Sequence, residues 1–405
     1  MNARSLFSGF ALAALLLSGS SALAAGPAQA ASGADGGRLL RVGPGQALRT
    51  IAAAAAQARD GDTIEIEAGD YAADVAVWTR DRLTVRGVGG RVRLLAAGAS
   101  AEDKAIWVVR GGAMTVENIA FSGARVSGRN GAGIRFEKGR LTVRNCLFED
   151  NENGILTSND PDAELEIEGS EFGHNGAGDG QSHNLYVGNI RRLKVSGSYF
   201  HHARVGHLLK SRAAESVVEY NRLTDEPGGR ASYELEFPGG GVAYVIGNLI
   251  EQGAQTENPY MISFGSEGYR WPRNELYLSA NTLVDERPQG GYFLRVQPGV
   301  GRVRAVNNLL FGRSALETAT EGAAAGTGEY AGNVKVDAGA FAQLASQDYR
   351  LRKRIVDTRL FGKLAVPGAA NGVELAPRRE YVHPRQMRAL AGAPAVPGAL
   401  QGLAP

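Results

Sequence analysis

Cysteine is almost absent from the sequence: Cys146 is the single one among 405 residues. One cysteine excludes an internal disulfide, so packing and hydrogen bonds must hold the fold together. Long apolar runs are missing beyond residues 7–17, which excludes a membrane-spanning helix in the rest of the chain. A basic run is missing too, and the net charge is only +2, so nucleic acid is not an expected partner.

The amino terminus has the features of an export signal. Arg4 precedes the apolar stretch, and small residues at 22 and 24 offer a cleavage site. We therefore expect residues 1–24 to be a signal peptide and the Gly- and Ala-rich residues 25–37 to be a flexible tether. The mature protein is expected in the periplasm or outside the cell, as a monomer without a membrane span.

What the sequence has in abundance is repetition. An aliphatic residue is followed five positions later by Phe or another large apolar residue, with a small or amide residue between them. Successive copies are separated by 23 to 33 residues, with a mean of 27. The copies end at Phe121, Phe148, Phe172, Phe200, Leu223, Ile250, Leu283 and Leu310. A period in this range indicates a stack of identical structural units.

Each unit has the alternation of apolar and polar residues that is typical of strands, as at Leu141 and Val143. A coil of about 25 residues with two or three short strands is one turn of a parallel β-helix. The leucine-rich horseshoe competes, but it needs a dense leucine pattern that this sequence lacks. The predicted fold class is therefore all-β, a parallel β-helix over residues 38–360, with a proline-rich extended tail over 361–405.

The amino-terminal end of this solenoid is predicted to carry a helix. Residues 46–59 are rich in alanine, which favours helix, and Leu48, Ile51 and Ala55 share one face. Because the ends of a solenoid must be covered, we expect this segment to be a capping helix over the core.

Two features of the repeat are predicted to be structural. Asparagines recur at one turn, where their side chains can bond to successive backbones; these are Asn221, Asn248, Asn281 and Asn308. Cys146 occupies a position in the repeat itself, so we expect a buried thiol rather than a nucleophile.

Three neighbouring coils depart from plain Gly, Asn and Ser corners, and five of the six histidines lie between 174 and 207. Stacking these coils places Leu185, Leu209, Leu235 and Ile262 inward, one above another. Alternation then predicts an outward column of Tyr186, Lys210, Glu236 and Ser263, on rungs about 4.8 Å apart. A second outward column is predicted to hold Asn184, Leu208, Glu234 and Met261.

The first column suggests acid–base chemistry on an acidic sugar. A lysine or tyrosine can remove a proton next to a carbonyl, and an arginine can neutralise an adjacent carboxylate. The predicted catalytic residues are Lys210, Glu236, Arg212, Tyr186, His183 and His207. The predicted substrate-binding residues are Asn184, Glu234, Arg230, Tyr233 and Tyr260.

Other interpretations of these residues stay open. Lys210 beside Glu236 also fits an ordinary cross-strand ion pair, and His183 and His207 take inward positions that suit structural histidines. Glu234 and Glu236, about 7 Å apart along a strand, would suit a glycoside hydrolase.

Two further alternatives involve no acid–base pair. Asp179, His183 and His207 have the ligand types of a zinc or manganese site. The tyrosines of these coils can also stack on sugar rings, as they would in a non-catalytic carbohydrate-binding or cell-envelope protein.

The overall plan resembles the pectate-lyase-like β-helix superfamily. The alanine-rich segment is followed by Asp60-Gly-Asp-Thr-Ile-Glu-Ile, then by Gly69-Asp-Tyr71, and then by the coils, so that the resemblance covers residues 40–360. It implies a right-handed parallel β-helix. It does not by itself give a reaction, because this superfamily includes lyases, hydrolases, epimerases, esterases and phage tailspikes.

A shorter segment resembles polysaccharide lyase family six, which includes chondroitinase B and alginate lyases. The likeness rests on the Lys210-Ser211 pair and on the residues that follow it, 220–225, 233–236 and 245–248. It implies that Lys210 is the catalytic base and that calcium takes part. Glu236 stands where the family has its arginine, and Ala203 and Val205 stand near its calcium-holding acids, so those roles stay unassigned.

The sequence thus predicts an exported enzyme that acts on a polysaccharide. A lyase that cleaves an acidic glycan by β-elimination is the first expectation, and a hydrolase or a binding protein on the same fold are the alternatives.

Overall fold

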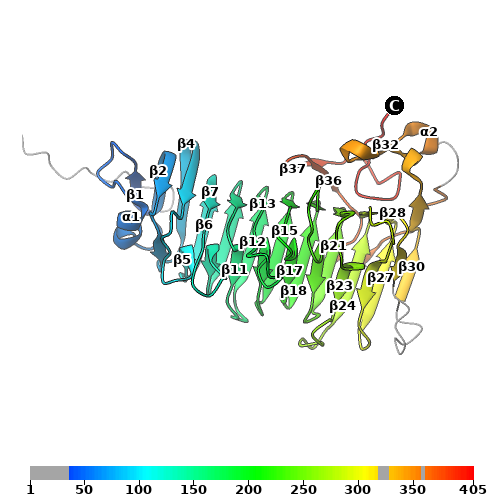
Figure 1. Cartoon of the computed structure of the whole chain (residues 1–405), viewed down its shortest axis with the longest axis horizontal. Helices are drawn as coiled ribbons and strands as arrows, with labels where there is room; N and C mark the ends of the chain where they lie inside the picture. Colours follow the sequence, from blue (N-terminus) through cyan, green and yellow to red (C-terminus); the bar gives the residue numbers. More distant parts are fainter. Residues whose placement is uncertain (1–35, 318–327, 357–360) are drawn as a thin grey trace, which may run out of the picture.

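Strands in this chain follow one another as the rungs of a long parallel stack (Figure 1). The computed structural model describes residues 36–317, 328–356 and 361–405. The predicted signal peptide and residues 25–35 of the predicted tether lie outside the described residues. Within them the chain makes about 11 turns of an all-β parallel solenoid, as the repeat predicts.

Each turn contributes a strand to three faces in order. The strands of the first face are β1 (Leu39–Val42), β2 (Thr63–Ala72), β4 (Leu83–Leu95), β6 (Ala113–Glu117), β9 (Arg140–Arg144), β12 (Glu164–Glu168), β15 (Arg192–Ser196), β18 (Glu215–Glu219), β21 (Val242–Ile246), β24 (Glu275–Ser279), β27 (Arg302–Val306) and β30 (Gly328–Ala331). The long strands β2 and β4 continue around the corner and start the second face as well.

The second face follows after a tight corner. It contains β7 (Ile119–Ser122), β10 (Leu147–Glu149), β13 (Glu171–Gly173), β16 (Tyr199–His201), β19 (Arg222–Thr224), β22 (Leu249–Gln252), β25 (Thr282–Asp285), β28 (Leu309–Phe311) and β31 (Val334–Val336).

The third face is a separate sheet, and it carries the candidate site. Its strands are β3 (Ala76–Trp78), β5 (Ala105–Val109), β8 (Ala132–Phe136), β11 (Asn153–Thr157), β14 (Leu185–Val187), β17 (Leu209–Ser211), β20 (Leu235–Phe237), β23 (Tyr260–Phe264), β26 (Tyr292–Val296) and β29 (Ala315–Glu317).

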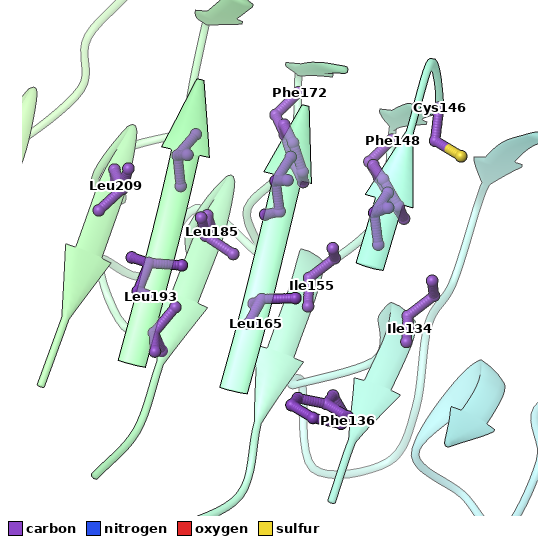
Figure 2. Packing of buried hydrophobic residues seen from close by; sticks show 14 of the residues in the cluster. Ile134, Phe136, Cys146, Phe148, Ile155, Leu165, Phe172, Leu185, Leu193 and Leu209 are labelled. Atoms are coloured by element: carbon purple, nitrogen blue, oxygen red, sulfur yellow. The ribbon is translucent and has the colours of Figure 1, made fainter. Parts of the chain in front are cut away.

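The repeated apolar residues form the inside of the stack. Phe121, Phe148, Phe172 and Phe200 lie one above another, with ring centroids 4.7 to 5.0 Å apart and nearly parallel planes. Figure 2 shows Phe148 and Phe172 in this interior, next to aliphatic residues of the third face. Their spacing is that of neighbouring strands, so the period of the sequence becomes a continuous apolar core.

The corner between the first and second faces holds the predicted ladder. The backbone N–H of Asn221 donates to Oδ1 of Asn248 at 2.9 Å. The backbone N–H of Asn248 donates in the same way to Asn281, and that of Asn281 to Asn308, each at 2.9 Å. The residue before each of them has a left-handed backbone, for example φ +56° at Tyr220. This prediction is confirmed.

Cys146 belongs to the same corner. Its backbone N–H donates to Oγ of Ser170 at 3.1 Å, and the side chain is fully buried. Burial raises the pKa of the thiol to about 12, so it is protonated at neutral pH and the expectation of a buried structural thiol is confirmed.

Helix α1 (Ile51–Gln57) lies at the amino-terminal end of the stack (Figure 1). It is shorter than the alanine-rich segment because Thr50 caps it and Leu48 instead forms a bridge with Val42. Ile51 and Ala54 are its buried residues. That the helix closes the core as a cap stays a prediction.

Beyond β31 the chain leaves the parallel stack. The 3-10 turns η1 (Ala338–Ala340) and η2 (Leu344–Ser346) flank β32 (Phe341–Gln343), which pairs antiparallel with β33 (Asp348–Leu351), and helix α2 (Lys353–Val356) follows. These residues, expected to belong to the β-helix, instead pack on the outward side of its second face, in an apolar cluster of Phe341, Tyr349 and Leu351 with Leu249, Val284 and Leu309.

The carboxy-terminal segment lies back along the solenoid (Figure 1). It contains two antiparallel hairpins, β34 (Ala369–Ala370) with β35 (Val373–Glu374) and β36 (Arg379–Val382) with β37 (Gln386–Ala389). The backbone N–H of Arg378 donates to the hydroxyl of Tyr220 at 3.0 Å, and that of Ala399 donates to Thr282 at 3.0 Å. These bonds fix the segment to the coils. No helix in the described part of the chain is long and apolar enough to cross a membrane.

Candidate active site

The third face presents the predicted column of polar side chains. Tyr186 pairs with Lys210, Lys210 with Glu236 and Glu236 with Ser263 on successive strands β14, β17, β20 and β23. The inward residues Leu185, Leu209, Leu235 and Ile262 are in register and fully buried, as predicted. Since side chains alternate along a strand, the column points away from the core.

The column extends further than the sequence indicated. Leu156 of β11 pairs with Tyr186, and Arg135 of β8 pairs with Leu156. Arg135, Leu156 and Tyr186 form part of the floor of a polar groove of about 750 Å³, whose walls include Asp179 and Gln181. The groove therefore runs along the third face and ends one rung before Lys210.

Lys210 and Glu236 form a closely spaced and largely shielded pair. Nζ of Lys210 lies 3.0 Å from Oε2 of Glu236, and the two side chains are 13% and 5% exposed. Ser266 donates a hydrogen bond of 2.6 Å to the other carboxylate oxygen. The ammonium group is still reachable from the surface, while the carboxylate is nearly closed off.

Several groups hold Glu236 in its charged form. Burial alone would raise the pKa of this carboxyl, but His207, Lys210 and Ser266 act against it and lower the pKa to about 2. Glu236 is therefore an anion throughout the neutral range. Such a group can orient and balance Lys210, but it is unsuited to be a general acid.

Two buried histidines support the pair from behind. The rings of His183 and His207 stack at 4.3 Å, and Nδ1 of His183 accepts from the backbone N–H of His207 at 2.9 Å. Nε2 of His207 lies 3.0 Å from Oε2 of Glu236. Burial lowers the pKa of both histidines, so both are neutral at pH 7 and Nε2–H of His207 faces the carboxylate.

Arg212 links the site to the loop that follows β23. It binds Glu267 through two hydrogen bonds of 2.8 and 2.6 Å, and its guanidinium carbon lies 5.0 Å from the ring centroid of Tyr186. Glu267 also lies 3.5 Å from Nζ of Lys210. Glu267 and Ser266 were not predicted, because they belong to the loop after β23, where the repeat has no pattern.

The predicted second outward column is wrong. Asn184, Leu208, Glu234 and Met261 are all fully buried. Asn184, Leu208 and Glu234 each directly precede a strand, where the chain is still turning, so simple alternation does not apply to them. Met261 lies within β23 but packs in the apolar core. Asn184 instead continues an interior row of amides, since its Oδ1 accepts from the side chain of Asn175 at 2.9 Å.

Glu234 shows why this correction matters. Neither of its oxygens has a hydrogen-bond partner among the described residues, and burial raises its pKa well above the usual range. The side chain is therefore an uncharged interior acid. The pair of surface carboxylates that a hydrolase would need is not formed by Glu234 and Glu236.

The other predicted substrate-binding residues scatter. Tyr233 lies edge-on to the ring of His207 at 5.0 Å, so it borders the site. Tyr260 stacks on Tyr292 at 5.7 Å, further along the face. Arg230 is exposed and lines separate cavities. The structure brings only the first of these three up to the buried histidines.

The predicted metal triad is wrong as well. Asp179 lies 3.5 Å from the guanidinium of Arg129, in the groove wall. Nδ1 of His183 accepts from the backbone of His207, and Nε2 of His207 lies against Glu236. Within the described ranges, one group of three potential ligands does converge, and it consists of different histidines.

The calcium that the lyase resemblance implies also lacks a fitting ligand set. Calcium takes six to eight oxygen ligands. The two carboxylates beside Lys210 are Glu236 and Glu267. Glu236 is paired with Lys210, and Glu267 is paired with Arg212. The residues described at this face do not form a calcium cradle.

Comparison with known proteins agrees on the architecture. Residues 97–248 match the family described as "Right handed beta helix region". Among solved structures, the crystal structure of pectate lyase Pel9A is similar, with a TM-score of 0.53, 12% sequence identity, and 77% of this chain and 85% of that chain covered. No curated protein matches the sequence significantly. The chain therefore has a pectate-lyase-like right-handed β-helix fold, and identity this low extends no further than the fold.

Proposed function

We propose that this protein is a polysaccharide lyase that cleaves an acidic glycan by β-elimination. The observation that carries the proposal is the single column Arg135, Leu156, Tyr186, Lys210 and Glu236, which runs from the polar groove to the shielded ion pair. A linear sugar chain in the groove would meet these side chains one after another. The similarity of the fold to a pectate lyase supports the same class.

The residues divide into complementary roles. Lys210, as the free amine, removes the proton next to the sugar carboxylate, and a double bond forms as the glycosidic C–O bond breaks. Tyr186, on the neighbouring rung, donates a proton to the leaving oxygen. Glu236, held as an anion, orients Nζ of Lys210 through their 3.0 Å contact. His207 fixes that carboxylate from the interior.

Arg135 is the best-placed residue to bind the substrate carboxylate. It lines the groove in the same column and makes no ion pair with any residue that the structure describes, and its one side-chain hydrogen bond is a 3.3 Å contact from Nη2 to Oγ of Ser158. Arg212, in contrast, is already bound to Glu267. A half-buried guanidinium without a carboxylate can form a bidentate pair with an incoming uronate.

The proposal is tested by incubating the mature protein with alginate, pectate, glycosaminoglycans and bacterial exopolysaccharides. We expect at least one polymer to give absorbance near 235 nm, from the unsaturated product of proton abstraction and elimination. New reducing ends without that absorbance would instead indicate hydrolysis, and glycan binding without either product would indicate a binding protein.

A further inference from the structure

Three histidines converge at the corner between the second and third faces. His174 follows β13, and His201 and His202 stand at the end of β16. One ring nitrogen from each lies within 4.8 Å of the others. His174 and His202 both have left-handed backbones, with φ of +57° and +46°, and therefore occupy equivalent corner positions of neighbouring coils. The repeat itself places the imidazoles together.

A glycine makes room for the central ring. Gly173 pairs with His201, and a Cβ atom at position 173 would lie 2.3 Å from Cε1 and 2.5 Å from Nε2 of His201. Any other residue would push the imidazole away. The local sequence thus holds the ring of His201 flat across the preceding strand.

Two ring nitrogens of the cluster lie within hydrogen-bonding distance of each other. Nε2 of His201 is directed at the carboxylate of Glu171, 3.5 Å away, and His202 bonds to the backbone of Pro227. Nδ1 of His201 then lies 2.8 Å from Nδ1 of His202. Two imidazole nitrogens at this distance share either a proton, as in a hydrogen bond, or a metal ion.

The cluster is open on one side. His174 is exposed, and His174 and His202 line a cavity of about 330 Å³ together with Arg204 and Arg230. An ion can enter from this cavity, and a water molecule can occupy a fourth position. Three imidazoles with one open position are a common arrangement for zinc, and a carboxylate that orients one of the histidines is its usual companion.

We propose that His174, His201 and His202 bind a divalent transition metal ion, with zinc as the favoured ion, and that Glu171 orients His201. The site joins the starts of two loops, residues 174–184 and 202–208, which carry His183 and His207 to the candidate active site. A bound ion would tie these loops together without touching Lys210 or Glu236. This inference stands whether or not the protein is a lyase.

The test is titration of the tag-free mature protein with zinc chloride, followed by calorimetry, and with cobalt(II), followed by visible absorption. We expect one ion per chain, a tetrahedral cobalt spectrum, and a higher unfolding temperature with zinc. His174→Ala changes an exposed residue and should weaken binding at least tenfold while the circular dichroism stays unchanged. Glu171→Gln should weaken it less.

His207→Gln is the matched control, because it changes a histidine of the other cluster and should keep one zinc ion per chain. The proposal is overturned if the wild type binds no zinc up to millimolar concentration. It is equally overturned if folded His174→Ala and His202→Ala proteins bind zinc as tightly as the wild type. In the first case the occupant between His201 and His202 is a proton.

Discussion

Two lysines of this solenoid stand beside glutamates on neighbouring rungs, but their surroundings differ. Lys194 lies on the first face between Glu166 and Glu219, at 3.8 and 3.7 Å, with a side chain that is 35% exposed. Lys210 lies on the third face, 3.0 Å from Glu236, and is 13% exposed. The sequence patterns around the two lysines are alike, so the difference comes from what surrounds them.

The two lysines differ in what covers their charged groups. Around Lys194 the first face meets solvent, and an ion pair there contributes little because water screens it. The third face is bordered by loops that bring Ser266, Glu267 and His207 against one pair of charges, with His183 stacked behind His207. The same rung geometry thus yields an ordinary surface contact on one face and a shielded constellation on the other.

Replacing each lysine by methionine is the strongest way to break this comparison. Lys210→Met should lower the lyase rate by 100-fold to 10,000-fold, roughly the range expected for loss of a general base. Lys194→Met should leave the rate within about twofold, because surface ion pairs are worth little. The initial rate of absorbance increase, measured on proteins with equal circular dichroism, checks both. Equal rates in the two variants would contradict the role of Lys210 as the catalytic base.

Acid titration sharpens the comparison by measuring how strongly Glu236 is held. Its pKa falls from 4.5 to about 2 on folding, so the charged carboxylate stabilises the native state above pH 4.5. That contribution, about 3 kcal/mol, is lost as the pH falls from 4.5 through 2. The difference in unfolding free energy between wild type and Glu236→Gln should therefore shrink by about 2 kcal/mol between pH 7 and pH 3.

Urea unfolding at a series of pH values measures this difference. Glu166→Gln is the control on the first face, where the carboxylate lies 3.8 Å from Lys194 and is 44% exposed. Glu166→Gln should change the unfolding free energy by less than about 1 kcal/mol at pH 7, because an exposed ion pair contributes little. A constant difference for Glu236→Gln over the pH series would mean that the carboxylate is not held by its neighbours.

The fold was predictable because every coil repeats the same sequence pattern. The Phe spacing and the Asn221–Asn308 ladder repeat the same contacts, so one pattern gives the core, the corner and the register that aligns Tyr186 with Lys210. Glu234 was misplaced because it lies where the chain turns into β20, and period-two alternation fails there. Glu267 had no repeated neighbour at all, so only the folded loop reveals it.

The smallest expected effect concerns two arginines on different faces. Arg135 lies in the groove without a carboxylate partner among the described residues, whereas Arg140 of β9 is 64% exposed and bound to Glu164 at 3.1 Å. Arg135→Ala should raise KM for an acidic glycan by about tenfold with a smaller change in kcat, because a charge-assisted contact is worth about 1.5 to 3 kcal/mol. Arg140→Ala should leave KM unchanged. Steady-state kinetics measures KM and kcat for both variants. If Arg135 binds the carboxylate of the substrate, a neutral polymer used as competitor should bind both variants equally.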